Sequence, residues 1–356
     1  MNHRRGDRWW YGIAALVLTS GAEAAVTPEA AKALGSTLTP AGAEAAGNAD
    51  GRIPPWRGRE GFEGQQFTLR HAELESLKAE GDASVLAAMR PAGLSETPLF
   101  TITRDNLERH ADTLSAGHRK LFERNPSYRM PVYAGARHAF LPPAVDAATR
   151  DNATRAELVG TDQLRGARLG IPFPLPQTGA EVIWNHKLKF RGAAVRRFNN
   201  EVIVEADGSF QLARIIEDVK LKYGHPTQPS AIEEGLILYY LQEVISPRRI
   251  AGQMLLVHET TDQTSGGRNA WLFNPGMGRT RRAPNVGYDN PKVSADGLMF
   301  NDQTDMFNGA LDRYQWNLVG KREMLIPYNA LHMIKPSATY EALVGKGHLN
   351  PDFTRY

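Results

Sequence analysis

The sequence predicts a mainly β, α+β protein: an antiparallel sheet with helices packed over it, preceded by an irregular N-terminal arm. From about residue 182 onward, runs of β-branched and aromatic residues alternate with turn residues, which is typical of antiparallel strands. Before that point the runs are short, helical in spacing and separated by Gly and Pro. The hydrophobic share of 42% and the charged share of 23% are those of a globular protein and exclude a disordered chain.

Residues 1–25 have the pattern of a secretory signal peptide. A basic stretch that ends at Arg8 precedes the apolar run Trp9–Leu18, and small residues then follow as far as Ala25. The apolar run is too short to span a bilayer as a permanent helix, and an N-terminal anchor or a buried helix is the alternative. We therefore expect export by the general secretory route and cleavage near Ala24 and Ala25.

The charge and the cysteine content exclude several kinds of partner and site. The formal net charge is +3 and no long Lys/Arg tract or acidic tail occurs, so no nucleic-acid partner is expected. The chain has no Cys, which excludes disulfides, thiolate nucleophiles, Cys-based zinc sites and a lipid-modified N-terminal Cys. We expect no metal and no cofactor, because the motifs that hold them are missing from the sequence.

Residues 26–100 are expected to be the irregular arm, with short helices. Thr27 is a good N-cap for a short helix that begins at Pro28. Residues 70–90 carry apolar side chains at loosely helical intervals, interrupted by Gly81. Between these two segments, Gly and Pro residues predict extended chain without regular structure.

Residues 101–356 are predicted to form a single β-rich domain. Its first part holds two short helices, the second of which begins at Ser115 and ends before Pro126. Residues 131–176 are predicted to be mostly loop. Within them, Ile171–Pro176 has a Pro at every second position, which excludes a central strand and predicts an edge or surface position.

The later part of the chain is predicted to be mostly strands. The pair Asp207–Gly208 between two alternating runs is a strong signal for a hairpin. One helix is predicted over residues 231–245, because Ser230 and Glu233 form a capping box before side chains at helical spacing. The predicted strands are 201–205, 210–216, 253–258, 269–274, 279–282, 314–319 and 322–326.

The motifs of common catalytic sites are missing. No Gly-x-Ser-x-Gly elbow, phosphate-binding loop or helical zinc motif occurs in the sequence. Asp302 and Asp305, with Asp289 nearby, are candidates to bind calcium or to act as an acid/base pair, and His186 is a candidate base. Loop carboxylates more often satisfy turn backbone, and a lone His is more often structural. We therefore expect no enzymatic activity, and a hydrolase that uses Asp302, Asp305 and His186 is a second alternative.

Apolar residues two positions apart on the predicted strands form the candidate ligand site, since such pairs share one face. The candidate groove residues are Leu255, Val257, Trp271, Phe273, Trp316 and Leu318. In one interpretation they pack against the helix of residues 231–245 as an ordinary core. In the other they line the concave side of a curved sheet and bind acyl chains, with that helix as a lid. The sequence leaves both interpretations open.

Arg279, Arg281 and Arg282 form the most strongly charged feature of the sequence. On a hairpin, Arg279 and Arg281 share one face and Arg282 takes the other. Planar guanidinium groups suit phosphate and carboxylate, so these residues are candidate contacts for a lipid headgroup, an acidic partner or the periphery of a membrane. A solvated, charged hairpin edge is the alternative.

Several longer motifs stand out in the sequence: Ala46–Pro54, Gly170–Pro176, Trp184–His186, Trp271–Pro284, Thr304–Gly309 and Gly347–Tyr356. Together they resemble an uncharacterised proteobacterial periplasmic family, a domain of unknown function often labelled outer membrane lipoprotein-sorting protein. They occur in order and span nearly the whole mature chain, and residues 57–95 match the family least. Within the family, the stretch Trp271–Arg282 is similar to a strand-turn-strand unit of the LolA/LolB-like carriers.

The resemblance implies an open half-barrel and a periplasmic protein that carries lipid, lipoprotein or another apolar molecule between the inner and outer membranes. The alternative is a non-catalytic interaction subunit of an outer-membrane or efflux-type envelope complex. In that case the arm of residues 35–60 and the Pro-rich residues 171–176 contact an outer-membrane or transporter protein. The family brings no catalytic residues. Its members usually continue past Tyr356 with further strands, so the resemblance also implies a C-terminally truncated chain.

Overall fold

The computed structural model describes residues 26–60, 70–91, 93–205, 207–262, 268–283, 286 and 288–356. The predicted signal peptide lies outside these described residues. The described chain forms one six-stranded antiparallel sheet and two small ribbons. The large sheet consists of β5 (Ala194–Val204), β6 (Phe210–Leu221), β7 (Leu236–Ser246), β8 (Met254–Thr260), β9 (Asn269–Asn274) and β10 (Arg279–Arg282).

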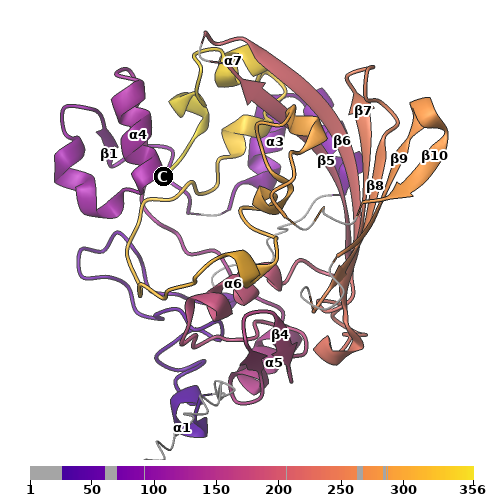
Figure 1. Cartoon of the computed structure of the whole chain (residues 1–356). Coiled ribbons are helices and arrows are strands. Elements are labelled where there is room, and N and C mark those ends of the chain that lie inside the picture. The colour runs from indigo at the N-terminus through magenta and orange to yellow at the C-terminus, as the bar shows by residue number, and fades with distance from the viewer. Residues whose placement is uncertain are drawn as a thin grey trace, which may run out of the picture.

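The strands of the large sheet pair in sequence order, from β5 at one edge to β10 at the other. The Asp207–Gly208 hairpin is confirmed: β5 and β6 pair from Ala194 opposite Lys220 to Val204 opposite Phe210. Figure 1 shows that the sheet is strongly curved and stays open, with β5 and β10 far apart. The mainly β fold is therefore as predicted, and its open curved sheet agrees with the expected half-barrel.

The other elements of the described chain are short helices and ribbons. The α-helices are α1 (Pro28–Ala31), α2 (His71–Glu80), α3 (Asp82–Met89), α4 (Ala116–Arg124), α5 (Pro143–Ala153), α6 (Gly179–Lys187) and α7 (Tyr340–Val344). The ribbons pair β1 (Phe100–Ile102) with β2 (Met130–Val132) and β3 (Glu157–Val159) with β4 (Gln163–Arg165). The 3-10 helices are Leu107–Thr113, Ile232–Glu234, Pro275–Met277, Val293–Ala295, Asn301–Gln303, Leu311–Arg313, Leu331–Ile334 and Pro351–Phe353.

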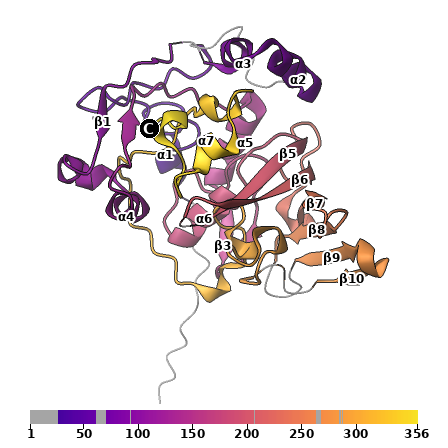
Figure 2. The ribbon, with the colours of Figure 1, turned by 90° about the horizontal axis from the view of Figure 1, so that it is seen from above.

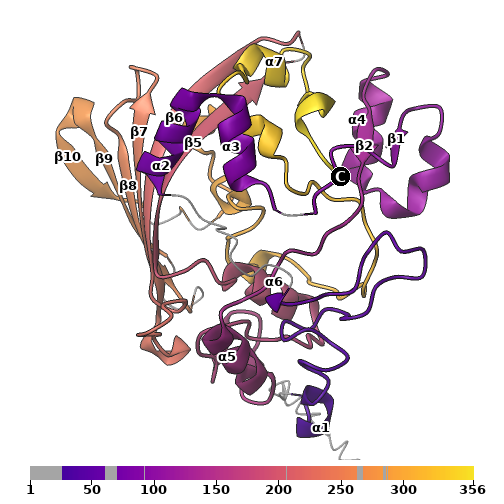
Figure 3. The same ribbon diagram turned by 180° about the vertical axis from the view of Figure 1, so that it is seen from behind.

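Most of the chain lies on the concave side of the large sheet. Figure 1 shows α6 and α7 inside the curve, with β1 and α4 farther from the sheet. Seen from above, β9 and β10 stand at the margin of the molecule (Figure 2). Seen from behind, α2 and α3 lie in front of the β5–β6 end of the sheet (Figure 3). The concave face is thus the one on which an enclosed site can form.

Three of the N-terminal helices begin where the sequence predicts. The Thr27 hydroxyl accepts the backbone N–H of Ala30 at 3.3 Å and caps α1. The Ser115 hydroxyl does the same for α4, accepting from His118 N–H at 3.1 Å. Gly81 separates α2 from α3. Its φ of 112° is a backbone conformation that other residues adopt only with strain.

The predicted helix of residues 231–245 is wrong. Only the 3-10 turn Ile232–Glu234 forms here, with Ala231 as its N-cap and Gly235 ending it in a left-handed conformation, while the Glu233 carboxylate accepts the backbone N–H of Gly166. Residues 236–246 then form β7, whose backbone pairs with β6 on one side and β8 on the other. The run is rich in Ile, Leu, Tyr and Val, which fit a strand as well as a helix. Backbone pairing with β6 and β8 decides in favour of the strand.

Two helices fall in segments that the sequence analysis predicts as loop or strand. Pro143 occupies the first turn of α5, where a missing N–H costs nothing. Thr178 and Glu181 form a reciprocal capping box at the start of α6, with bonds of 3.2 Å in each direction. Both signals are visible in the sequence and precede short apolar runs.

The Pro-rich segment Ile171–Pro176 lies in the core and not on the predicted surface. Pro172 is fully buried and Phe173 is 7% exposed. The side chain of Asn185 on α6 replaces the missing strand partner: its Oδ1 accepts Phe173 N–H at 2.8 Å and its Nδ2 donates to the Phe173 carbonyl at 2.6 Å. Since the segment is enclosed by its own chain, it offers little surface to a partner.

The N-terminal arm packs against the later chain through backbone carbonyls. Arg137 donates to the carbonyl oxygens of Glu44 at 2.6 Å and Pro54 at 3.2 Å. The Trp56 indole donates to the Ala139 carbonyl at 2.8 Å. The arm is irregular, as predicted, but one side chain from residues 131–140 orders much of it.

Candidate functional site: a pocket on the concave face of the sheet

Side-chain alternation gives the large sheet two different faces. Arg197, Glu217, Gln242 and Leu255 lie opposite one another across β5, β6, β7 and β8. They therefore share one face, on which Glu217 and Gln242 are buried. This is the concave face. Leu241, next to Gln242 on β7, points to the convex face and is 38% exposed.

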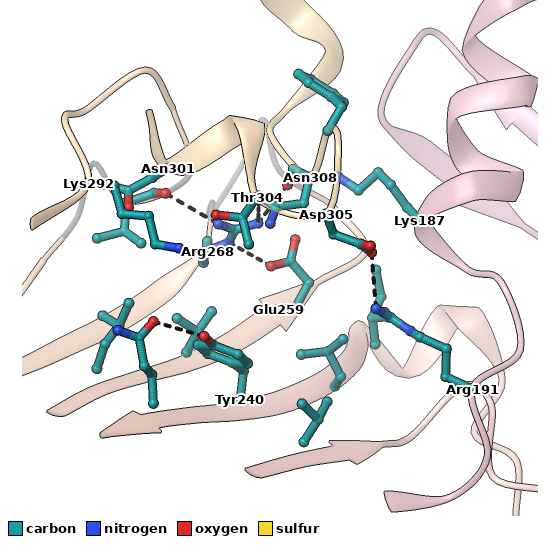
Figure 4. Close-up of a pocket in the computed structure, with 18 of the residues that line it drawn as sticks. Lys187, Arg191, Tyr240, Glu259, Arg268, Lys292, Asn301, Thr304, Asp305 and Asn308 are labelled. Carbon is teal, nitrogen blue, oxygen red and sulfur yellow. Dashed lines mark hydrogen bonds and ion pairs between the residues drawn. The ribbon is translucent and has the colours of Figure 1, made fainter. Parts of the chain in front are cut away.

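A pocket of about 110 Å³ lies between the concave face and the loops above it. In Figure 4 the strands form its floor, and the loop that carries Asn301, Thr304, Asp305 and Asn308 lies over them. Its apolar wall is formed by Val219, Ile237, Leu238, Leu255, Val257 and Phe307. Charged and amide side chains form the rest, so the hollow has an aliphatic part and a polar part.

A buried ion pair joins the sheet to the loop above the pocket. Arg268 Nε lies 2.6 Å from Glu259 Oε2, and the two side chains are 7% and 9% exposed. Arg268 also donates to the carbonyl oxygens of Asn308 at 2.6 Å and Val286 at 3.2 Å. Because a buried charge is costly unless it is paired and hydrogen-bonded, this arrangement favours one fixed position of the loop.

A second buried network lies along the floor of the pocket. Arg197 Nε is 3.0 Å from Glu217 Oε2, and the Tyr240 hydroxyl donates to the same carboxylate. The Tyr240 hydroxyl also lies 2.9 Å from Gln242 Oε1. Burial and the nearby Glu217 carboxylate raise the pKa of Tyr240, so this residue acts as a hydrogen-bond donor. Lys292 forms a further ion pair with Glu201 beside this network.

Basic residues gather at one end of the pocket. Lys187 is buried at the end of α6, and its Nζ donates to the Gly309 carbonyl at 2.8 Å. Burial lowers the pKa of Lys187 to about 8. Arg191 Nη1 and Lys189 Nζ lie 3.1 Å and 2.6 Å from the same oxygen of Asp305, Oδ2. The half-buried cations Arg191 and Lys189 therefore share the carboxylate of Asp305.

Leu255 and Val257 line the pocket, as predicted for the groove, but Trp271 and Phe273 do not. The register places Trp271 opposite Leu256 and Phe273 opposite Met254, on the convex face. The prediction that these two aromatic residues share a wall with Leu255 and Val257 is wrong. Alternation defines the pairs within a strand, whereas the phase between β8 and β9 depends on their register.

Trp316 and Leu318 lie in a segment, residues 315–330, that has neither helix nor strand. The predicted strand pair 314–319 and 322–326 is therefore wrong. Trp316 packs on the wall residue Phe307, with ring centroids 5.0 Å apart, so it lies behind the pocket. Leu318 is 43% exposed and far from a groove position. An extended run becomes a strand when a neighbouring backbone pairs with it along its length, and here no described strand does so.

Arg279, Arg281 and Arg282 lie on β10 and are exposed. Arg279 and Arg281 are opposite Asn274 and Leu272, and Arg282 is opposite Trp271. The first two therefore follow the concave face and the third follows the convex face, as alternation predicts. The described pocket lies elsewhere, and a headgroup or partner contact at these residues stays a prediction.

The candidate catalytic residues do not converge on the pocket. His186 Nε2 lies 2.6 Å from the backbone carbonyl of Asp305, while the Asp305 carboxylate faces Lys189 and Arg191. Of His186, Asp302 and Asp305, the last is the one that lines the pocket. Asp289 pairs with Arg313 at 2.5 Å. Within the described ranges, no group of three His, Asp or Glu side chains is placed to hold a metal ion.

The sequence analysis missed the charged part of the pocket. Glu259 is in phase with Leu255 and Val257 on β8, and a carboxylate in phase with an apolar strand face signals a buried charge. A buried carboxylate requires a cationic partner, and in the structure this partner is Arg268. Lys187 and Arg191 gave no comparable signal, because their burial depends on how α6 and its following loop pack against the sheet.

The chain matches known sequences over most of its length. Residues 101–356 match the model of the family described as "Protein of unknown function (DUF1329)". The uncharacterized protein PA3922 of Pseudomonas aeruginosa is 42% identical over 352 residues, which cover 97% of this chain and 73% of that protein.

Two solved structures show weaker similarity. A domain from Vibrio parahaemolyticus, named as an outer membrane lipoprotein-sorting protein domain, is 18% identical with a TM-score of 0.24, and the match covers 33% of this chain and 46% of that one. A DUF1329 family protein from Desulfovibrio piger is 16% identical with a TM-score of 0.24, covering 36% of this chain and 45% of that one. The match spans less than half the length of either solved chain. Likeness at this TM-score establishes neither a shared fold nor a shared function.

Proposed function

We propose a carrier function for this chain, which belongs to the DUF1329 family of proteins of unknown function. It binds lipid, lipoprotein or another apolar molecule in the periplasm and moves it between the inner and outer membranes. The observation that carries this proposal is the pocket on the concave face, with the aliphatic side chains of β6, β7 and β8 along one side. A hollow lined in this way favours apolar groups over water.

The size of the pocket suits an alkyl chain of moderate length. A hollow that holds a single water has a volume of about 10–15 Å³. The pocket, with about 110 Å³, therefore admits several methylene groups. Each buried methylene contributes about 0.8 kcal/mol, and eight of them about 6 kcal/mol before the cost of association. Binding of this strength needs no reacting group.

The proposed periplasmic location rests on the signal-peptide pattern of residues 1–25. Across the part of the chain that the structure describes, no helix is both long and apolar enough to cross a membrane.

The test uses two neighbouring leucines that face opposite ways. Leu255→Trp places an indole in the pocket, whereas Leu256→Trp places the same group on the convex face. Binding of the neutral dye N-phenyl-1-naphthylamine, followed by its fluorescence, should weaken at least about tenfold in Leu255→Trp and remain unchanged in Leu256→Trp. Lipid extraction and mass spectrometry of protein purified from the periplasm identify the natural ligand. Equal dye binding by both variants would contradict the carrier proposal.

A second candidate is a non-catalytic subunit that contacts an outer-membrane or efflux-type transporter protein. It is favoured by the convex face, where Phe198 and Ile245 are 49% and 44% exposed. Exposed apolar side chains that gather on one face are typical of interaction surfaces. Membrane pull-downs with wild type and with Phe198→Asp separate the two functions, because this substitution leaves the pocket intact and should abolish capture of a stoichiometric partner.

A further inference from the structure

The charges at the end of the pocket near Arg191 are not balanced. Elsewhere in the pocket, Arg268 has the carboxylate of Glu259 and Arg197 has the carboxylate of Glu217. At the end near Arg191, the two cations Arg191 and Lys189 share a single carboxylate, that of Asp305. This end of the pocket therefore carries an excess of positive charge.

Arg191 is incompletely satisfied by the residues around it. A guanidinium has five N–H donors, and Arg191 makes one hydrogen bond to Asp305, from Nη1 at 3.1 Å. Its Nε is buried and has no hydrogen-bond partner among the described residues. Burial lowers the pKa of Arg191, as expected for a charge that is partly removed from water. A further anion beside Arg191 would relieve this cost.

The loop that supplies Asp305 has an unfavourable backbone. Asp305 and Met306 are consecutive residues with φ values of 56° and 71°, in the left-handed region that side chains other than Gly rarely adopt. The Met306 side chain is 87% exposed, so packing does not hold it there. The turn is held by the Asp305 ion pairs, by the His186 contact with the Asp305 carbonyl, and by backbone hydrogen bonds from Phe307 to Asp305 and from Asn308 to Asp302. Strain of this kind is common where a loop changes position on binding.

We propose that Arg191 and Lys189 bind the carboxylate or phosphate of an amphiphile whose alkyl chain enters the pocket, and that Asp305 occupies this anion position when no ligand is bound. The inference rests on the proposed carrier function and names its ligand class, an acidic amphiphile. Arg191 suits this role because its planar fork binds a carboxylate or phosphate through two parallel bonds. Figure 4 shows Arg191 and Asp305 facing each other at one side of the hollow.

The alkyl chain then has one direction in which to lie. Val219, Leu238 and Val257 line the floor beside the basic end, and Val219 and Val257 are 6% and 4% exposed. The anion stays near solvent, since the Arg191 and Lys189 side chains are 27% and 37% exposed. The headgroup thus keeps part of its hydration while the chain loses its contact with water.

The experiment measures binding by isothermal titration calorimetry with four probes: decanoate, decyl phosphate, decanol and inorganic phosphate. Wild type should bind decanoate and decyl phosphate more tightly than decanol, and inorganic phosphate weakly. Arg191→Gln should weaken binding of both acidic amphiphiles by about tenfold, because a charge-assisted hydrogen bond is lost. Asp305→Asn should strengthen it by about threefold, because the competing carboxylate is gone. For each variant the change in decanol binding should be smaller than the change in binding of the acidic amphiphiles.

The matched controls are Arg196→Gln and Asp218→Asn, which break an ion pair of 2.6 Å on the convex face, between β5 and β6. Thermal unfolding verifies that each variant is folded, and Lys189→Gln, at a half-exposed site, replaces Arg191→Gln if that variant does not fold. Equal binding of decanol and decanoate in every variant would overturn the anion site and leave the carrier function standing. If wild type bound none of the four probes, both the anion site and the carrier function would be overturned. If inorganic phosphate bound as tightly as decyl phosphate, the proposal that the ligand is an amphiphile would be overturned.

Discussion

The concave and convex faces of the large sheet are built from alternate residues of the same strands, yet they treat charge in opposite ways. On the concave face Glu217 and Glu259 are 5% and 7% exposed. On the convex face the Arg196–Asp218 pair is 63% and 40% exposed, while the neighbouring Phe198 is 49% exposed. Charged groups are thus buried on the inner face, and aromatic groups are left partly in water on the outer face. Polarity alone would assign these faces the wrong way round.

The difference teaches where specificity resides. On the concave face, Glu201 pairs with Lys292 outside the sheet, and Arg268, the partner of Glu259, donates to the Asn308 carbonyl, so these ion pairs help to position the loops above the pocket. On the convex face, contacts such as that between Trp271 and His258, with ring centroids 4.8 Å apart, stay within the sheet. Substitutions at neighbouring positions should therefore have very different effects.

The largest difference is expected between Val257→Asp and Leu256→Asp. Val257 is 4% exposed on the concave face, and an unpaired carboxylate there costs several kcal/mol, enough to prevent folding. Leu256 faces outward and should lose about 1 kcal/mol or less. Urea unfolding followed by circular dichroism compares the two. Similar free energies of unfolding would show that the two faces do not differ as described.

The next largest effect is expected for Glu259→Gln, which leaves Arg268 as an uncompensated buried cation. Breaking a buried pair from one side typically costs about 3–5 kcal/mol. Asp218→Asn removes one partner of the exposed pair on the convex face and should have no measurable effect. The measurement is again urea unfolding. A small effect of Glu259→Gln would mean that water reaches the pair and that the pocket is wetter than its side-chain burial indicates.

Lys187 gives a pH-dependent contrast. Burial lowers the pKa of the Lys187 amine from 10.5, the value expected in the unfolded chain, to about 8 in the native state. Between these values the unfolded state binds more protons, so folding stability rises with pH. The stability of wild type relative to Lys187→Met should thus increase by up to about 3 kcal/mol from pH 8 to pH 10.5. Parallel pH curves for the two proteins would contradict the burial of this amine.

The smallest effect is expected for Arg282→Gln. The Arg282 guanidinium lies 5.9 Å from the centroid of the Trp271 ring on the convex face. An exposed cation–π contact contributes about 0.5–1 kcal/mol, and thermal unfolding should show a shift of that order. A destabilisation of several kcal/mol would indicate that the convex face is more buried in solution than in this structure.

Local signals predicted two hairpins correctly and a third, over residues 314–326, wrongly, because a turn signal does not show whether the flanking chain will pair. The Asp207–Gly208 turn and the Pro275–Gly278 turn lie between strands as expected, because turn chemistry is local. The capping box of Thr178 and Glu181 is equally local and was overlooked. In contrast, the run from residue 236 to 246 suits helix or strand equally, and pairing with β6 and β8 decided it.

The candidate site was predicted in part for a related reason. Leu255 and Val257 line the pocket because alternation along one strand is readable from sequence. Trp271 and Phe273 were assigned to the same wall, although the register between β8 and β9 sends them to the other face. Arg191, Lys187 and Asp305 come from separate segments, and no spacing in the sequence connects them.

The sequence by itself determined the class of the fold, the hairpin turns, the helix caps and the face-sharing pairs within each strand. These depend on interactions between residues a few positions apart. The tertiary structure decided the relative phase of neighbouring strands, the fate of residues 236–246 and the meeting of Arg191 with Asp305. Those outcomes depend on contacts between segments that are distant in sequence, whose energies arise only once the sheet has curved and the loops have closed over it.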